Sequence, residues 1–530
     1  MAHPDEPGSG DGWNRAPRIR RDAADARPAP EVPASERRRP WLLGLTAILM
    51  VVFSAPPLTN LVRGEPNKDY SLWYQVGAAM RDGLEIYPDP DANRLFPFMY
   101  PPSAAALLGY VSYLGPYATG VLLVLAHSLA WLGAVLLSVR LATAGGAGMR
   151  NPILYVVPSL VIIALIHNTY LLGQPNLTLL MLLLAAFLCL QKGRDGWAGV
   201  LVATGAAIKA FPILALGYFV YRRRWRASAA TVVALAAWLL VVPLAFRTPP
   251  QAVRDVKVWA GGMLFTYNKQ GIAQRPFRSF SYKNQSIMAM AHRLLRDVPA
   301  DGEAVLAKRV AAIRRERKVG ESDGVRRDGS FDLKTMLTAP PQGSTALATA
   351  FAGIDEDLKK AWKVNVASWD FRSVTLATLA GMAALGLFTL AVLPRDRERT
   401  PRTDALEFAL VTLLIVMFSP LSFNYAFVWL IYPATVALNE AFEHPAADPR
   451  RRAIGRAWLA LILLLPATAI AFPLYAQAYG NLFVPALLLV LTLGWTLHEV
   501  RRESKVDETA PARRNADSTR LAAGAETSPA

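Results

Sequence analysis

Cysteine, histidine and charged side chains are all scarce in this chain of 530 residues. The one cysteine, Cys189, lies in an apolar run, so no intramolecular disulfide can form. The six histidines are scattered, and no two of them stand at the spacing that zinc ligands require. We therefore expect no metal site.

Apolar residues take the place of the missing charge. They make up 53% of the chain, and only 18% of residues are charged, whereas a soluble protein carries about 25% charged residues. Apolar runs long enough to cross a hydrocarbon core of about 30 Å recur along the sequence. Because a backbone in lipid must satisfy its own hydrogen bonds, these runs are predicted to be helices. We expect an all-α fold, a polytopic transmembrane helical bundle with about ten full spans plus short re-entrant helices.

Basic residues exceed acidic ones by 57 to 40, which gives a net charge of +17. In a soluble protein such an excess can indicate nucleic-acid binding. Here the basic residues gather in the tails and in short loops between apolar runs, the pattern of positive-inside topology. The run Arg37-Arg38-Arg39 precedes the first span. We therefore predict cytoplasmic tails and no nucleic-acid partner.

Two apolar segments do not fit a simple crossing. Residues 101–115 are too short to span comfortably. Residues 197–221 have basic residues at both ends and contain Lys209 and Pro212. Since proline interrupts a helix, we expect two short helices that return the chain to the same side, although a full span is the alternative.

The same patterns divide the chain into five parts. The loop 64–100 and the charged insert 297–370 are both predicted to be external. The parts are a disordered cytoplasmic tail (1–40), an N-terminal membrane module with the loop 64–100 (41–247), a large external segment with the insert (248–371), a C-terminal membrane module (372–499) and a disordered cytoplasmic tail (500–530).

Asp69 is the candidate catalytic residue, because it lies a few residues beyond the first span, on the predicted outer side. Partial desolvation near the interface can raise the pKa of a carboxylate toward the range of a general base. The simpler interpretation is a solvated loop carboxylate.

Other polar residues stand at the predicted outer ends of apolar runs. Lys209 interrupts an apolar segment, which costs free energy and favours a functional role over simple snorkelling to the interface. The amides of Gln174 and Asn176 can bind sugar hydroxyls or phosphate oxygens, or can simply belong to a turn. The remaining candidates are Tyr100, which could also be an interfacial anchor, and Asn284, Gln285 and His292, which surround a predicted helix start.

The order of these motifs resembles glycosyltransferase family 87, part of the GT-C superfamily of integral membrane glycosyltransferases. The motifs span roughly residues 41–295 and 372–498. They are Asp69-Tyr70, Gly83 with Tyr87-Pro88, Tyr100-Pro101-Pro102, Gly173-Gln174-Pro175-Asn176, Gly193-Arg194, Lys209 with Pro212, Arg223-Arg224-Trp225, Asn284-Gln285-Ser286 and Ser419-Pro420-Leu421-Ser422.

The resemblance implies a cell-envelope enzyme that takes a sugar, typically mannose, from a polyprenyl-phosphate donor. It implies transfer with inversion to a lipid or glycan acceptor on the external face of the cytoplasmic membrane, with Asp69 as the base and no cofactor. Lys209 and the turn 173–176 would help to bind the donor. The sequence departs from the family at Asn424-Tyr425, where many relatives have a histidine, and in its long insert.

Two other function classes remain open from the sequence. A transporter or lipid flippase would carry ionisable residues in the middle of several spans and two related halves. A scaffold protein would tolerate replacement of Asp69 and Lys209. Convergence of Asp69 with the turns near residues 174, 209 and 284 on one site would favour the enzyme.

Overall fold

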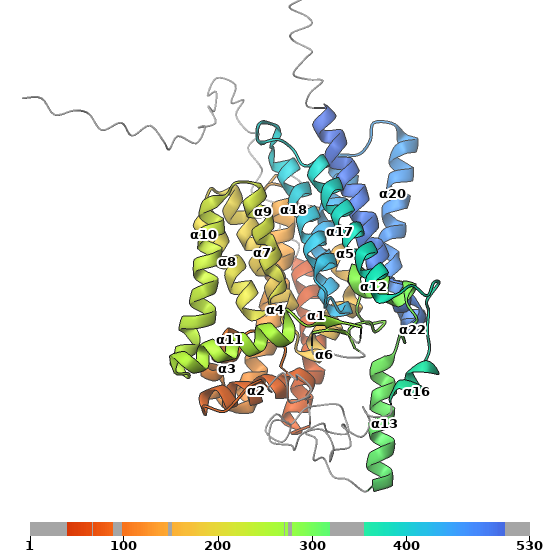
Figure 1. Ribbon diagram of the computed structural model, residues 1–530. Helices are drawn as coiled ribbons and strands as arrows, with labels where there is room; N and C mark the ends of the chain where they lie inside the picture. The colour runs from red at the N-terminus through yellow and green to blue at the C-terminus, as the bar shows by residue number, and fades with distance from the viewer. Residues whose placement is uncertain are drawn as a thin grey trace, which may run out of the picture.

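The computed structural model describes residues 40–65, 67–87, 98–146, 151–269, 271–273, 278–317 and 354–503. These residues form a bundle of helices (Figure 1), in which the strands β1 (Tyr267–Asn268) and β2 (Gly271–Ile272) make one short antiparallel pair. The all-α prediction is therefore confirmed. Residues 1–39 and 504–530 of the predicted tails and residues 318–353 of the insert lie outside the described residues, whereas residues 500–503 of the predicted tail are helical.

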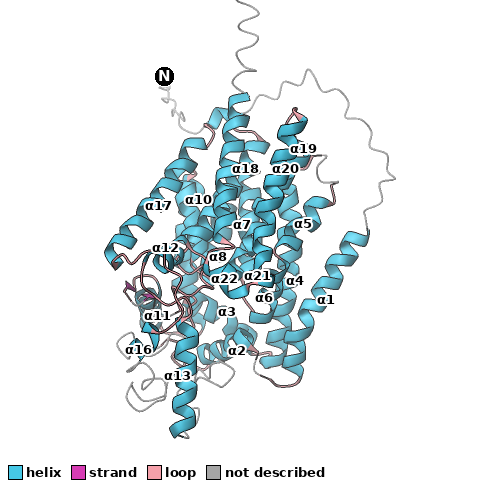
Figure 2. Ribbon diagram, turned by 90° about the vertical axis from the view of Figure 1, so that its right-hand side faces the viewer, coloured by secondary structure: helices cyan, strands magenta, loops and turns pink. Residues whose placement is uncertain are grey.

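Six helices in the described part of the chain are long and apolar enough to cross a membrane. The helices α5 (Ile153–Val161) and α6 (Ile163–Leu172), bent by 65° at their junction, make a seventh if they form one span. Figure 2 shows the long helices side by side. The six are α1 (Pro40–Val62), α4 (Gly115–Ala142), α10 (Trp225–Ala236) continued by η4 (Ala237–Val241) and η5 (Val242–Ala245), α17 (Phe371–Val392), α20 (Pro449–Leu464) continued by η8 (Leu465–Ala467) and α21 (Thr468–Ala471), and Phe483–Glu503.

The prediction of about ten full spans was too high. Three predicted spans correspond to α7 (Asn176–Gln191), to α18 (Pro401–Phe418) and to η7 (Asn424–Leu430) followed by α19 (Ile431–Glu443). At about 1.5 Å per residue, α7 is shorter than a hydrocarbon core. All three are largely buried among other helices, and Phe187 of α7 stacks on Phe408 of α18 at 4.3 Å between ring centroids. Their apolar residues fill the core of the bundle, which hydropathy alone does not distinguish from a lipid-facing span.

The two short apolar segments form short helices rather than long spans. Residues 101–115 contain α3 (Pro102–Ser112), and residues 197–221 fall into α8 (Asp195–Ile208), η3 (Phe211–Leu214) and α9 (Ala215–Tyr221). Asp195 at the start of α8 and Arg224 after α9 lie 3.6 Å apart. Both ends of this segment therefore lie at the same end of the bundle, and Lys209 stands at the tip of the hairpin.

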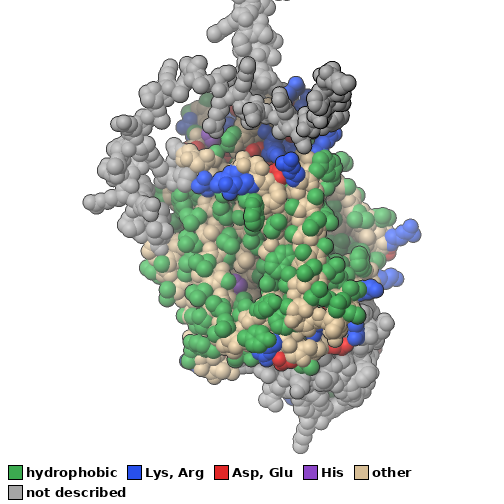
Figure 3. Space-filling model, turned by 90° about the vertical axis from the view of Figure 1, so that its left-hand side faces the viewer, with side chains coloured by type: hydrophobic (Ala, Val, Ile, Leu, Met, Phe, Trp, Pro, Cys, Tyr) green, Lys and Arg blue, Asp and Glu red, His purple; other side chains and the backbone are tan. Residues whose placement is uncertain are grey.

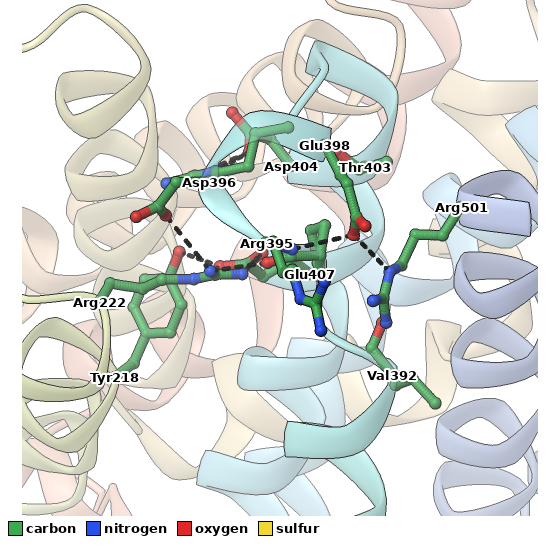
Figure 4. A network of polar contacts seen from close by, with 12 residues as sticks. Tyr218, Arg222, Val392, Arg395, Asp396, Glu398, Thr403, Asp404, Glu407 and Arg501 are labelled. Atoms are coloured by element: carbon green, nitrogen blue, oxygen red, sulfur yellow. Dashed lines mark hydrogen bonds and ion pairs between the residues drawn. The ribbon is translucent and has the colours of Figure 1, made fainter. Parts of the chain in front are cut away.

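An ionic network closes one end of the bundle, which we call the tail end (Figure 4). The fully buried Glu407 accepts hydrogen bonds from Arg222 and from the hydroxyl of Tyr218, and the Arg501 guanidinium pairs with Glu398 at 2.8 Å. On the face that Figure 3 shows, the surface between the two ends is mostly apolar, with lysines and arginines at its margins, as expected for a membrane-facing band.

The opposite end, which we call the insert end, carries the shorter surface helices (Figure 1). The candidate site described below lies at this end. These elements are α2 (Lys68–Arg81), α3, α11 (Pro249–Met263), α12 (Ile287–Leu295), α13 (Gly302–Arg317), α16 (Ile354–Lys359) and α22 (Pro473–Ala478), while η6 (Asp396–Glu398) belongs to the tail end.

Candidate active site

The turn between α6 and α7 is the centre of the candidate site. Gly173 ends α6 with a φ of +71°, a conformation that glycine adopts without strain. A Cβ at this position would also lie 3.0 Å from the ring of Tyr70. The glycine therefore lets the chain turn tightly, so that Gln174 and Asn176 follow directly at the start of α7.

Helix α2 brings Asp69 to this turn. The indole of Trp73 donates a hydrogen bond to the Gly173 carbonyl at 2.8 Å, and the Tyr70 hydroxyl donates one to the Tyr170 carbonyl at 2.8 Å. These two bonds fix the first turns of α2 against the end of α6. Lys68, immediately before Asp69, has a φ of +48°, a conformation that is uncommon outside glycine and that concentrates at functional sites.

Gln174 connects Asp69 with two other predicted residues. Its side-chain nitrogen donates a hydrogen bond to the Asp69 carboxylate. Its side-chain oxygen accepts from the Tyr100 hydroxyl at 2.9 Å and lies 3.5 Å from the Lys209 ammonium. Gln174 is only 3% exposed, so water cannot easily replace these partners. The Gln174 amide thus contacts the Asp69 carboxylate through its nitrogen and the Lys209 ammonium through its oxygen.

Lys209 reaches this amide from the tip of the hairpin. The chain becomes extended at Lys209, directly after α8. Its ammonium lies 3.3 Å from the Asn176 side-chain oxygen and within 6 Å of the ring centroids of Tyr100, Phe211 and Tyr425. Burial lowers the pKa of Lys209 to about 8, although the charge of Asp69 opposes the shift. Both oxygen contacts of the Lys209 ammonium are longer than a good hydrogen bond, so the ammonium can also bind an anionic group.

Asn176 has unused hydrogen-bonding capacity. Its side-chain nitrogen is buried and has no partner among the described residues, while its backbone carbonyl accepts from the Trp429 indole at 2.9 Å. Such a donor suits an acceptor oxygen supplied by a ligand.

Asn284 and Gln285 make contacts that support a neighbouring turn. The Asn284 side chain donates to the carbonyls of Ser279 and Pro420, at 2.7 and 2.9 Å, and its backbone pairs with Phe423. The Gln285 side chain donates to the carbonyls of Tyr282 and Gln477. The Asn284 amide therefore holds the turn 419–425, which supplies Tyr425 to the site, whereas the Gln285 amide joins its own turn to Gln477.

His292 lies in an aromatic cluster of its own. Its Nε2 is 2.6 Å from the Tyr267 hydroxyl, and its ring stacks on Phe371. Burial, with a further contribution from the charge of Arg296, lowers the pKa of His292 to about 3. The imidazole is therefore neutral at ordinary pH. Among the described residues its ring nitrogens contact Tyr267 and Arg296, not Asp69, Gln174 or Lys209.

The site thus brings together five predicted residues, Asp69, Tyr100, Gln174, Asn176 and Lys209. Tyr425 belongs with them, although the sequence departs from the family pattern at Asn424-Tyr425. No group of three or more histidine, cysteine, aspartate or glutamate side chains stands in metal-binding geometry within the described ranges.

Comparison with known proteins gives two matches. Residues 98–313 match the model of glycosyltransferase family 87, a range that includes Tyr100, Gln174, Asn176 and Lys209 but begins after Asp69. A polyprenol-phosphate-mannose-dependent alpha-(1-2)-phosphatidylinositol pentamannoside mannosyltransferase of Mycolicibacterium smegmatis is 31% identical over 233 residues. That alignment covers 41% of this chain and 54% of the relative, so the chain spans about half the length of the relative.

No solved structure matches the chain. The family match agrees with the family that the ordered motifs predicted, and it covers four of the five residues gathered around Gln174. Residues 98–313 of this chain are therefore similar to glycosyltransferase family 87.

Proposed function

We propose that this chain is a membrane hexosyltransferase that transfers mannose from a polyprenyl-phosphate donor to a hydroxyl group of a lipid or glycan acceptor. The observation that carries the proposal is the contact of Gln174 with both the Asp69 carboxylate and the Lys209 ammonium. A carboxylate can take a proton and a cation can stabilise a leaving phosphate. The family match and the donor named for the relative support the same donor class.

In the proposed reaction, the acceptor oxygen attacks the anomeric carbon on the side opposite the phosphate, so the configuration inverts. The bond from that carbon to the acceptor oxygen forms, and its bond to the phosphate oxygen breaks. Polyprenyl phosphate leaves with the electron pair, and Asp69 takes the acceptor proton. Lys209 and Asn176 stabilise the charge on the leaving phosphate. Because the donor is already activated, the proposal requires no metal or other cofactor.

We place this reaction on the external side of the cytoplasmic membrane. Asp69 and α2 lie at the insert end, whereas Arg222 and Arg501 lie in the ionic network of the tail end (Figure 4). Basic residues favour the cytoplasmic side. The candidate site is then at the external side, where lipid-linked sugars and their acceptors would meet.

A transporter or lipid flippase is the second function class, and the arrangement of Asp69 and Lys209 favours the enzyme over it. A transporter would place ionisable side chains midway along several spans. Here the carboxylate, the ammonium and the amides converge at the turn 173–176, where helices begin and end.

The test compares two donors. Membranes that contain the protein are incubated with a crude extract of host lipids and glycans and with radiolabelled mannose, either as polyprenyl-phosphate mannose or as GDP-mannose. The proposal predicts protein-dependent labelling of an acceptor from the lipid donor alone, with the anomeric configuration inverted. Labelling that occurs only from GDP-mannose, or movement of the lipid donor across the membrane without sugar transfer, would contradict it.

A further inference from the structure

Arg278 is a second cation at the candidate site. It follows the strand β2, and its guanidinium lies 5.0 Å from the ring centroid of Phe423. The rings of Phe423 and Tyr425 are stacked with centroids 5.8 Å apart, and the Lys209 ammonium lies 5.3 Å from the Tyr425 ring. In this stacked pair, the Lys209 ammonium thus lies against the Tyr425 ring and the Arg278 guanidinium lies against the Phe423 ring.

The guanidinium of Arg278 is incompletely satisfied. Its ion pair with Glu303, in the first turn of α13, is 3.6 Å long, which exceeds a good hydrogen bond. Its Nε is buried and has no hydrogen-bond partner among the described residues. One carboxylate oxygen of Glu303 is also buried and without a partner. Since an arginine has five N–H donors in a fixed fork, Arg278 has donors available for another acceptor.

The charge of Arg278 acts on the reacting groups. Burial acts to lower the pKa of its guanidinium, but the charges of Glu303, Tyr425, Asp69 and Tyr100 together raise it above its ordinary value. The charge of Arg278 in turn helps to lower the pKa of Lys209. Arg278, Lys209 and Asp69 therefore influence one another, although Arg278 is far from both in the sequence.

We propose that Arg278 binds the phosphate of the lipid donor together with Lys209. This inference rests on the proposed function and names a residue that the sequence analysis did not select. Arginine forms bidentate hydrogen bonds to phosphate, whereas lysine acts as a point charge. The phosphate gains negative charge as the sugar departs, so a second cation stabilises the leaving group more than the starting donor.

The charged insert then has a role at this site. Glu303, which lies at the start of the insert helix α13, holds the guanidinium when no phosphate is bound, and the Phe423 ring supports its plane. When the donor phosphate arrives, the guanidinium donates to it through Nε, which has no hydrogen-bond partner among the described residues. Arg278 is the binding residue in this account, and Glu303 is a positioning residue.

The experiment compares Arg278→Gln and Arg278→Lys with Arg456→Gln. Arg456 is a matched control because its guanidinium also lies over a phenylalanine, Phe442, at 4.7 Å, but on α20. The readouts are the donor KM and kcat of transfer, the thermal stability in detergent, and stabilisation by polyprenyl phosphate with phosphate-free polyprenol as the control ligand.

The inference predicts that Arg278→Gln raises the donor KM and lowers kcat, so that kcat/KM for the lipid donor falls at least about tenfold, with a similar loss of stabilisation by polyprenyl phosphate. Arg278→Lys should regain part of both effects, and Arg456→Gln should change neither. Unchanged donor KM and ligand stabilisation in Arg278→Gln would overturn the inference. Equal losses in Glu303→Gln and Arg278→Gln would also overturn it, because they would show that the ion pair has only a structural role.

If the wild-type protein transfers no sugar, the proposed function fails. The stabilisation measurements then still test whether Arg278 binds phosphate. Polyprenyl phosphate should then stabilise the wild-type protein more than polyprenol does, and Arg278→Gln should lose this difference. Equal stabilisation of the wild-type protein by the two lipids would overturn phosphate binding at Arg278.

Discussion

The side-chain amide of Gln174 donates a hydrogen bond to the carboxylate of Asp69. The two residues are 105 positions apart in the sequence and come from different turns at the insert end. The bond orients the carboxylate, because Gln174 is itself held by the Tyr100 hydroxyl at 2.9 Å. Orientation of the base therefore depends on a residue that does not take the proton.

The first prediction tests this orientation. Gln174→Leu should lower kcat by about 10-fold to 100-fold, because a misplaced catalytic group can cost that much. Transfer rates at saturating lipid donor, normalised to the amount of folded protein, measure the effect. An unchanged kcat would show that Asp69 does not need this amide.

The second prediction concerns the packing that places α2. A Cβ on Gly77 would lie 2.4 Å from the Leu108 carbonyl oxygen of α3, so the two helices would have to separate. Gly77→Ala should destabilise the protein by about 1–3 kcal/mol and reduce transfer. The matched control is Gly261→Ala in α11, where the added methyl group meets no atom within 4 Å. Thermal unfolding in detergent and the transfer rate give the two readouts, and equal behaviour of the variants would contradict the packing argument.

The third prediction is a pH dependence that Lys209 produces. Lys209 lies between two short helices, outside the candidate spans, and burial lowers its pKa to about 8 from 10.5. A lysine with a lowered pKa loses its charge at a lower pH, so kcat/KM for the lipid donor should fall as the pH rises through about 8. Lys209→Arg should abolish this decline, because arginine stays charged. A decline that persists in Lys209→Arg would assign it to another group.

The fourth prediction concerns the ionic network of the tail end. Glu407 is fully buried and pairs with Arg222, so Arg222→Met leaves a buried charge without its partner. The variant should lose about 3–5 kcal/mol of stability, and the double variant Arg222→Met, Glu407→Leu should recover most of it. Arg226→Met, at an exposed position nearby, is the control. Thermal unfolding checks this, and a double variant as unstable as Arg222→Met would contradict the account.

The sequence allowed much of the candidate site to be predicted, because its residues stand at the ends of apolar runs. Asp69, Gln174 and Lys209 interrupt or follow such runs, and the structure brings them together. Arg278 and Tyr425 were missed, because their proximity to Lys209 depends on the stacking of Phe423 on Tyr425 rather than on a local pattern.

The number of spans could not be predicted for a related reason. Helices α7, α18 and α19 are as apolar as lipid-facing helices, but other helices enclose them. A fully buried helix can be shorter than the hydrocarbon core and can carry a paired charge such as Glu407. The roles of Asn284, Gln285 and His292 in donor binding stay predictions, and their contacts hold loops and an aromatic cluster.

The most direct test of the central claim compares Asp69→Asn with Asp82→Asn. Asp69 lies in the first turn of α2, and Asp82 directly follows the helix. Asp82 is exposed, and among the described residues it pairs with its neighbour Arg81. The measurement is mannose transfer from the polyprenyl-phosphate donor at equal amounts of folded protein. We predict a loss of about 10²-fold to 10⁴-fold in Asp69→Asn and no loss in Asp82→Asn. Transfer by Asp69→Asn within about twofold of the wild-type rate would contradict the assignment of Asp69 as the general base.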